Sequence, residues 1–244
     1  MTGIFQTSGA TREVTDDRMA PTGDRVSDAV DAELRRIGVH LGRLKVEIEE
    51  ERAVHALERT TLVSDAVERL RHILHDVRWL ADLDQVALEA EWVELEQVVT
   101  ALLDRWHGRL RAADALVIRE PLPAVWVSRA DVSIVLEELL ENAVRYRGSD
   151  PLVIRISAER DEDEWIVDMA DNGRGFDAQH AEQVFDPLFV LVGDGVPMGS
   201  GVGLTAARML MERNRGSIKA LSHAGVGTTV RLRFRTDGGS GERR

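Results

Sequence analysis

Residues 138–146 read ELLENAVRY, and three glycine-bearing segments follow them: DNGRG at 171–175, GSGVGL at 199–204 and GVGT at 225–228. Glycine permits backbone conformations and close approaches that other residues do not, and the amides of such turns can face phosphate oxygens. The middle segment leads into an expected helix at 202–213, whose N-terminus carries unpaired donors and partial positive charge. Together these segments predict a polyphosphate site.

The segment ELLENAVRY belongs to a strong amphipathic pattern that predicts a helix at 131–146. Glu138, Asn142 and Arg145 are spaced four and three residues apart, which places their side chains on one face and leaves the apolar residues for the core. An isolated asparagine is usually a surface or capping residue. Beside three glycine turns, Asn142 becomes a candidate for ligand binding.

The segments ELLENAVRY, DNGRGFD, VFDPLF, GSGVGL and GVGTT together resemble, in order and spacing, the conserved boxes of histidine kinases. These boxes are the N box, the F box and three G boxes of a superfamily that the kinases share with DNA gyrase and the heat-shock chaperones. The resemblance covers roughly residues 89–236. It implies an α/β sandwich that holds ATP and Mg²⁺ between its helices and a flexible lid.

The resemblance also implies roles for single residues. Asn142 would coordinate the Mg²⁺ that bridges the phosphates, and Asp171 would accept a hydrogen bond from the adenine amino group. Phe185 and Phe189 would fold the lid onto the core. The other ATP-binding residues that it implies are Arg145, Tyr146, Gly173, Gly175, Gly199, Gly201, Gly203, Leu204 and Thr228.

Two positions depart from the family's pattern. Glu138 stands where many histidine kinases have asparagine, while related ATPases place a general-base glutamate there. Glu138 is therefore expected to act either as a catalytic base or as a second Mg²⁺ ligand. The lid sequence Phe189-Val190-Leu191 lacks the basic residue often found after the F box, which weakens the expected stabilisation of the transferring phosphoryl group.

Before these segments, apolar residues recur in alternating steps of four and three, a pattern typical of helices with a heptad seam. A hairpin of two such helices leaves apolar surface uncovered unless two hairpins pair. We therefore expect an α+β protein in which a helical hairpin forms a dimeric four-helix bundle, followed by an α/β sandwich ATP-binding domain. The two seams are Val30, Leu34, Ile37, Leu41, Leu44 and Ile48, and Leu62, Ala66, Leu70, Ile73, Val77 and Leu80.

Four parts of the chain are expected from these patterns. They are a disordered N-terminal tail at 1–26, a dimerisation and histidine-phosphotransfer-like hairpin at 27–88, a histidine-kinase-like ATP-binding domain at 89–236 and a flexible C-terminal tail at 237–244. Periodicity within the ATP-binding domain predicts helices at 95–110, 131–146 and 202–213, and strands at 93–95, 116–119, 125–127, 152–158, 165–170, 217–221 and 228–234.

The hairpin resembles a histidine-phosphotransfer domain in architecture and position, and His40 is the only histidine beside its first seam. Gly38 and Gly42 bracket His40, and each costs a helix about 1 kcal/mol relative to alanine, so something is expected to approach closely there. A neutral imidazole is a competent nucleophile near neutral pH. His40 is thus the candidate phosphoacceptor.

The immediate neighbours of His40 support a different interpretation. The family's acceptor is followed by an acidic residue and, five positions on, by proline, whereas Leu41 and Lys45 stand here. The missing acid removes a group that would orient or deprotonate the imidazole. A purely structural His40 therefore stays open as the alternative.

Composition narrows the classes of function. A formal net charge of -12 argues against nonspecific binding to nucleic acid or to anionic membranes. The absence of cysteine excludes disulfides, thiolate metal sites and cysteine nucleophiles. No stretch approaches the roughly 20 apolar residues of a spanning helix, and the N-terminus lacks a basic leader and an apolar segment, so a cytoplasmic protein is expected.

The leading hypothesis is an ATP-dependent protein histidine kinase of a two-component system, which autophosphorylates His40 and passes the group to a response-regulator aspartate. Its expected cofactors are ATP and Mg²⁺, and its expected partners are a second copy of the chain, a receiver domain and a separate sensor protein. One alternative is a nucleotide-binding adaptor that docks a regulator without autophosphorylation. Another is a serine kinase that acts on an anti-sigma antagonist, which would have no use for the hairpin.

Overall fold

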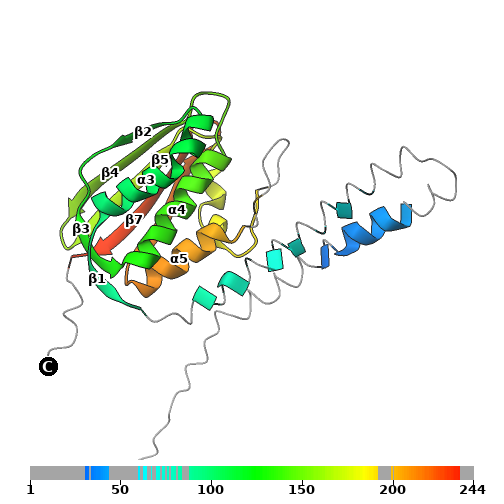
Figure 1. Cartoon of the computed structure of the whole chain (residues 1–244), viewed down its shortest axis with the longest axis horizontal. Helices are drawn as coiled ribbons and strands as arrows, with labels where there is room; N and C mark the ends of the chain where they lie inside the picture. The colour runs from blue at the N-terminus through cyan, green and yellow to red at the C-terminus, as the bar shows by residue number, and fades with distance from the viewer. Residues whose placement is uncertain are drawn as a thin grey trace, which may run out of the picture.

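The computed structural model of the chain describes residues 31–32, 34–43, 60, 63–64, 67, 70–71, 73–74, 76, 78–80, 82–83, 88–191, 199 and 201–236. Residues 88–191 and 201–236 form a layered domain of sheet and helices, and the described helical residues that precede it extend away from this domain (Figure 1). The expected tails at 1–26 and 237–244 lie outside the described residues. No helix in the described ranges is both long and apolar enough to cross a membrane.

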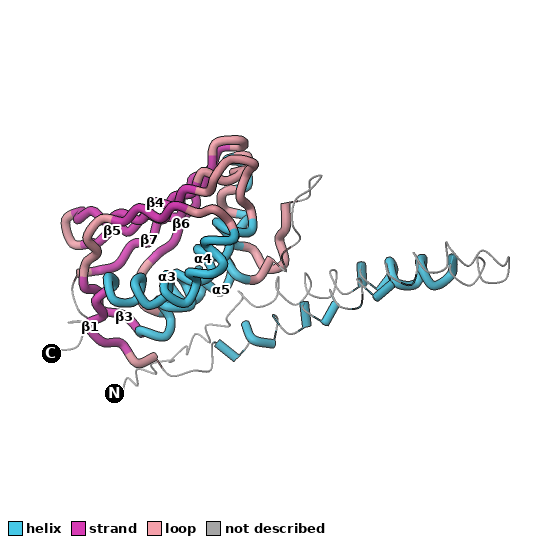
Figure 2. The backbone as a smooth tube through the Cα atoms, turned by 45° about the horizontal axis from the view of Figure 1, so that its top comes forward, coloured by secondary structure: helices cyan, strands magenta, loops and turns pink. Residues whose placement is uncertain are grey.

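A five-stranded sheet forms one layer of the domain, in the spatial order β2-β4-β5-β7-β6. β2 pairs with β4 in parallel, and the other neighbours are antiparallel. A separate antiparallel pair of β1 and β3 lies at one end of the domain (Figure 2). The strands are β1 (Ala90–Glu94), β2 (Leu116–Arg119), β3 (Ala124–Ser128), β4 (Val153–Asp161), β5 (Glu164–Asp171), β6 (Ser217–His223) and β7 (Gly227–Arg235).

Three helices cover one face of the sheet (Figure 2). They are α3 (Leu95–Ala112), α4 (Arg129–Arg145) and α5 (Gly203–Arg213), and two short 3-10 turns, η1 (Ala178–His180) and η2 (Gln183–Phe185), precede α5. The core lies between the helices and the sheet, because every second strand residue points toward the helices. Its fully buried members include Val135, Leu136, Leu140, Ile154, Ile156, Val167, Leu210 and Leu232.

The opposite face of the sheet carries charged side chains in cross-strand pairs. The guanidinium of Arg231 on β7 donates to both carboxylate oxygens of Asp168 on β5, at 2.9 and 2.7 Å. Arg233 makes a similar contact with Glu164 at 2.9 Å. Opposite charges on neighbouring strands stabilise the pairing of a solvated sheet face.

Every helix and strand expected between 89 and 236 is present, with ends displaced by no more than three residues. The largest displacements concern β1, which the sequence placed at 93–95, and β4, which continues beyond its apolar stretch. β1 ends at Glu94 because Leu95 already begins α3. The pattern of burial fixed these elements, whereas their ends depend on strand pairing.

The described residues between 31 and 83 are all helical. Two residues of the first expected seam are largely uncovered, since Leu34 is 50% exposed and Leu41 is 48% exposed. On the second seam, by contrast, Leu80 is 7% exposed and belongs to the core of the layered domain. Several other seam positions lie outside the described residues, and so does the pairing of two hairpins.

Candidate functional site

A cavity of about 510 Å³ opens between α4, the start of α5 and the ends of β5 and β7. This volume is within the usual range for a site that binds a small molecule. The structure brings ten of the expected site residues together in its wall, although they come from four separate segments of the sequence. These residues are Glu138, Asn142, Arg145, Tyr146, Asp171, Gly175, Gly201, Gly203, Leu204 and Thr228.

Asp171, the last residue of β5, lies in the cavity wall. One oxygen of its carboxylate accepts a hydrogen bond from the amide of Gly173 at 2.8 Å. Burial raises the pKa of Asp171 above its ordinary value, while hydrogen bonds from the backbone of Gly173 and Thr228 oppose that shift. The apolar side chains of Met169 and Val230 line the wall nearby. A polar acceptor beside an apolar wall suits a flat heteroaromatic base.

The turn after Asp171 requires a glycine at 173. A Cβ there would lie 2.7 Å from the Asp171 carboxylate and 2.8 Å from the backbone oxygen of Tyr146. The same Tyr146 oxygen accepts a hydrogen bond from the amide of Arg174 at 2.9 Å. The turn is therefore fixed against the end of α4, which joins two of the expected motifs.

The α4 side of the cavity carries Asn142 and Arg145, one helical turn apart. The guanidinium of Arg145 is paired with the Glu141 carboxylate at 2.5 Å. A Cβ at Gly199 would lie 2.5 Å from that guanidinium and 3.1 Å from the hydroxyl of Tyr146. Gly199 thus lies directly against both side chains, outside the cavity wall itself.

Another part of the cavity wall combines the Glu138 carboxylate with the N-terminus of α5. A Cβ at Gly203, the first residue of α5, would collide with the carboxylate of Glu138. Burial raises the pKa of Glu138 to about 7; the carboxylates of Glu141 and Asp76 add to the rise, and Arg145 opposes it. The group can therefore exchange a proton near neutral pH, as a general base must.

The donors in this part of the wall fit a magnesium ion that is bound together with a nucleotide. Mg²⁺ is usually held by one or two protein oxygens and by substrate phosphates. The amide oxygen of Asn142 and the carboxylate of Glu138 are the groups that would hold it. In the described ranges, no group of three or more His, Asp or Glu side chains forms a metal site on its own.

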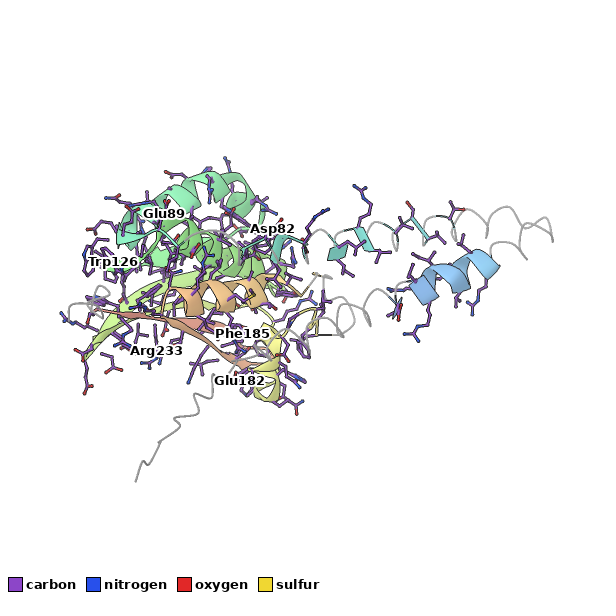
Figure 3. All side chains as sticks on the ribbon, turned by 90° about the horizontal axis from the view of Figure 1, so that it is seen from below. Asp82, Glu89, Trp126, Glu182, Phe185 and Arg233 are labelled. Carbon is purple, nitrogen blue, oxygen red and sulfur yellow. The ribbon has the colours of Figure 1, made fainter. Side chains whose placement is uncertain are left out.

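Phe185 lies outside the cavity wall. It is 2% exposed and belongs to the core, where the guanidinium of Arg208 stacks 4.3 Å from the centre of its ring. Arg208 also pairs with Glu182 at 3.0 Å, and Figure 3 shows Glu182 and Phe185 at the same end of the domain. Phe185 therefore anchors η2 to α5, whereas Phe189 and Leu191 reach the cavity.

His40 lies on the N-terminal helical residues, away from the cavity wall. Its Nδ1 atom is buried and has no hydrogen-bond partner among the described residues. A Cβ at Gly38 or Gly42 would meet nothing within 4 Å in this single chain. The close approach expected from those two glycines is therefore absent within the described part of the chain.

Asp76 and Trp79 also line the cavity, and no motif pointed to them. They come from the N-terminal helical residues, one position before the seam residues Val77 and Leu80. Their spacing of three residues put both on one helix face, which was the only available signal. The partner of that face could not be read from the sequence, because it depends on how the two parts of the chain dock.

Comparison with known proteins finds a family match for part of the layered domain. Residues 128–238 match the family described as histidine kinase-, DNA gyrase B-, and HSP90-like ATPase. Cyanobacterial phytochrome A from Nostoc is 26% identical over 86% of this chain and 28% of its own length. The methanogenesis regulatory histidine kinase FilI from Methanothrix harundinacea is 31% identical over 69% of this chain and 19% of its own length. The chain spans less than a third of these curated relatives.

Solved structures of histidine kinases share the fold. The histidine kinase ThkA in complex with response regulator protein TrrA has a TM-score of 0.67 at 16% identity, and the match covers 91% of this chain and 63% of that one. The histidine kinase AdeS of Acinetobacter baumannii has a TM-score of 0.52 at 22% identity, covering 84% of this chain and 98% of that one. At such identities the likeness establishes the fold alone.

Proposed function

Because residues 128–238 belong to the histidine kinase-, DNA gyrase B- and HSP90-like ATPase family, we propose that this chain is an ATP-dependent protein histidine kinase of a two-component system. The family implies ATP binding. The observation that carries the proposal is one cavity whose wall combines Asp171 with Asn142, Glu138 and the N-terminus of α5. Such a cavity suits a molecule with a base at one end and phosphates at the other.

In this proposal the nucleotide lies along the cavity in a single direction. The carboxylate of Asp171 accepts a hydrogen bond from the adenine amino group, and Met169 and Val230 contact the ring. The phosphates face the N-terminus of α5, where unpaired amides and the helix dipole favour negative charge. Bound Mg²⁺ would neutralise the phosphates, held by Asn142 and Glu138.

Phosphoryl transfer takes place between the γ-phosphorus and a nitrogen of His40. The bond from that phosphorus to the bridging oxygen breaks, a bond to the neutral imidazole nitrogen forms, ADP leaves, and the ring's remaining N–H proton is released to solvent. The nucleophile is Nε2, because Nδ1 of His40 is buried. His40 is not in the cavity wall, so the ATP-binding domain must approach His40 of the same chain or of a second copy.

A second copy of the chain completes the helical part. Leu34 and Leu41 are about half exposed, and both belong to the expected heptad seam. A second hairpin would cover them in a four-helix bundle. The phosphoryl group then passes to a receiver aspartate, a proposal supported by the likeness in fold to ThkA, whose structure includes a response regulator.

Incubation with γ-labelled ATP tests the proposal directly. The wild type is expected to gain an acid-labile label, which disappears in both His40→Ala and Asn142→Ala. His40→Ala should still bind nucleotide, because His40 lies outside the cavity. Nucleotide binding without any label would favour the adaptor. The residues Leu41 and Lys45, which replace the acidic residue and the proline of the family's pattern, agree with that alternative. An acid-stable label would identify a serine kinase.

A further inference from the structure

The last described helical residues before β1 are part of the core of the ATP-binding domain. Leu80 and Leu83 are 7% and 8% exposed, and Trp79 packs against the same cluster of apolar residues. Asp76 and Trp79 reach the nucleotide cavity. We call Asp76, Trp79, Leu80 and Leu83 the docked helical segment.

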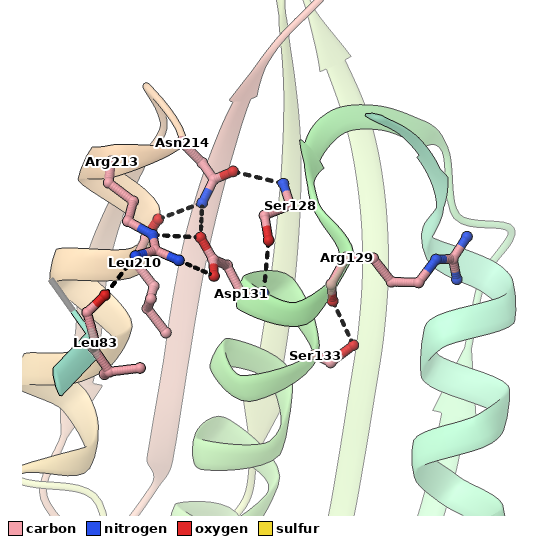
Figure 4. A network of polar contacts seen from close by, with 8 residues as sticks. All are labelled: Leu83, Ser128, Arg129, Asp131, Ser133, Leu210, Arg213 and Asn214. Atoms are coloured by element: carbon pink, nitrogen blue, oxygen red, sulfur yellow. Dashed lines mark hydrogen bonds and ion pairs between the residues drawn. The ribbon is translucent and has the colours of Figure 1, made fainter. Parts of the chain in front are cut away.

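A buried polar cluster fixes one end of this segment (Figure 4). The guanidinium of Arg213, at the end of α5, donates to both carboxylate oxygens of Asp131, at 2.6 and 2.5 Å. Its third donor reaches the backbone oxygen of Leu83 at 2.6 Å. Asn214 donates to Asp131 at 2.7 Å and accepts from the amide of Ser128 at 2.7 Å. The side chain of Arg213 therefore links the docked helical segment to the start of α4 and to the end of α5.

The other end of the segment lies at the nucleotide cavity, because Asp76 and Glu138 both line its wall. Leu83 is linked to Asp131 through Arg213, and Asp76 lines the cavity with Glu138. The two residues of each element are seven positions apart, but the number falls from Leu83 to Asp76 and rises from Asp131 to Glu138. The docked segment therefore runs antiparallel to α4, from the Arg213 cluster to the cavity.

From this arrangement we propose that Trp79 is a nucleotide-binding residue and that Arg213 is the residue that positions it. The site would then be shared between the ATP-binding domain and the helical part that carries His40. Five tryptophans occur in the chain, and within the described residues Trp79 alone lines the cavity. The proposal rests on nucleotide binding at this cavity, and it does not depend on transfer to His40.

Titration with Mg-ADP tests the role of Trp79, with the full chain and without any phosphoryl transfer. Bound nucleotide is expected to quench the intrinsic fluorescence of the wild type, and Trp79→Phe should lose most of that quenching. Trp79→Ala should weaken the affinity for Mg-ADP about tenfold. Trp92→Ala is the matched control, since Trp92 is 55% exposed on β1 and should bind as the wild type does.

The positioning role of Arg213 needs a variant that keeps Asp131 paired. Arg213→Lys retains the positive charge beside Asp131 but cannot also bond the Leu83 oxygen through a rigid fork. It should weaken Mg-ADP binding about threefold, and it should add little to Trp79→Ala in the double variant. Full additivity of the two substitutions would refute the positioning role.

A measurement on the wild type removes any dependence on how the variants fold. Mg-ADP should slow amide hydrogen exchange in the peptide that contains Trp79 and Leu80. Unchanged exchange there, together with unchanged affinity in Trp79→Ala, would overturn this inference while leaving the ATP site intact. Failure of the wild type to bind Mg-ADP at all would instead overturn the proposed function.

Discussion

The site residues of the ATP-binding domain can be identified from the sequence, whereas those of the helical residues before it cannot. In the ATP-binding domain, a Cβ at Gly173 or Gly175 would collide with the backbone of a neighbouring segment, and the short motifs around these glycines are visible in the sequence. In the helical part, the useful residues are Asp76 and Trp79, whose surroundings come from another part of the chain. Chemistry that depends on local backbone shape can be read from sequence, whereas chemistry that depends on docking cannot.

The largest expected effect on stability comes from disrupting the contact between the ATP-binding domain and the docked helical segment. Asp131→Ala would leave the partly buried guanidinium of Arg213 without the carboxylate of Asp131, which is itself only 3% exposed. Loss of one partner of a buried ion pair costs about 3–5 kcal/mol. Urea denaturation should report that loss. Glu91→Ala, which breaks the exposed pair with Arg129, is the control and should cost less than about 1 kcal/mol.

A substitution at Asp171 separates the two parts by function. Asp171→Ala removes the acceptor at the base end of the cavity, and the affinity for Mg-ADP should fall about 100-fold, or roughly 2.7 kcal/mol. His40→Ala should leave that affinity unchanged, because His40 is outside the cavity wall. Calorimetric titration measures both. Equal losses in the two variants would contradict the separation of binding from phosphoacceptor chemistry.

The pH dependence of stability tests the ionisation of Glu138, which lines the cavity together with Asp76 of the docked helical segment. The folded pKa of Glu138 is about 7, above its ordinary 4.5, so folding favours the protonated form. Its contribution to stability is present below pH 4.5 and is lost as the pH rises toward 7. Glu138→Gln should therefore stabilise the protein by about 1–3 kcal/mol at pH 8.5.

The matching measurement for Glu138→Gln is urea unfolding at pH 4.5 and pH 8.5, on the variant and on the wild type. The stabilisation should nearly vanish at the lower pH, where the wild-type carboxyl is also neutral. Asp76→Asn should give a smaller gain of the same sign at pH 8.5, because the Asp76 carboxylate is one of the lesser causes of the shift. A gain independent of pH would rule out titration of Glu138 as its source.

The smallest expected effect concerns a single methyl group. Gly203→Ala places a Cβ against the Glu138 carboxylate, which must then move away from the start of α5. Affinity for Mg-ADP should fall about threefold to fivefold, or roughly 1 kcal/mol. At Gly108 a Cβ meets nothing within 4 Å, so Gly108→Ala should leave binding unchanged and stabilise α3 by up to about 1 kcal/mol.

Much of the domain was predictable because its elements follow periodic burial. The α4 helix was expected at 131–146 and spans Arg129–Arg145. Asn142 was assigned to the site from its helical spacing, from the three glycine segments and from the resemblance to histidine kinases. Phe185 was expected among the ATP-binding residues and in the packing of the lid onto the core; it packs in the core and lies outside the cavity wall. The bond between Arg213 and the Leu83 oxygen spans 130 residues and involves a backbone group, which no sequence pattern marks.

The charged face of the five-stranded sheet has a consequence for the behaviour of the protein at high concentration. Helices cover only one side of this sheet, and the cross-strand pairs of Arg231 with Asp168 and of Arg233 with Glu164 occupy the other. A bare apolar layer of that size would adhere to its counterpart in neighbouring molecules. Two molecules that stacked through the charged face of the sheet would have to strip water from these ion pairs, which costs free energy. The two arginine–carboxylate pairs therefore oppose aggregation through this face.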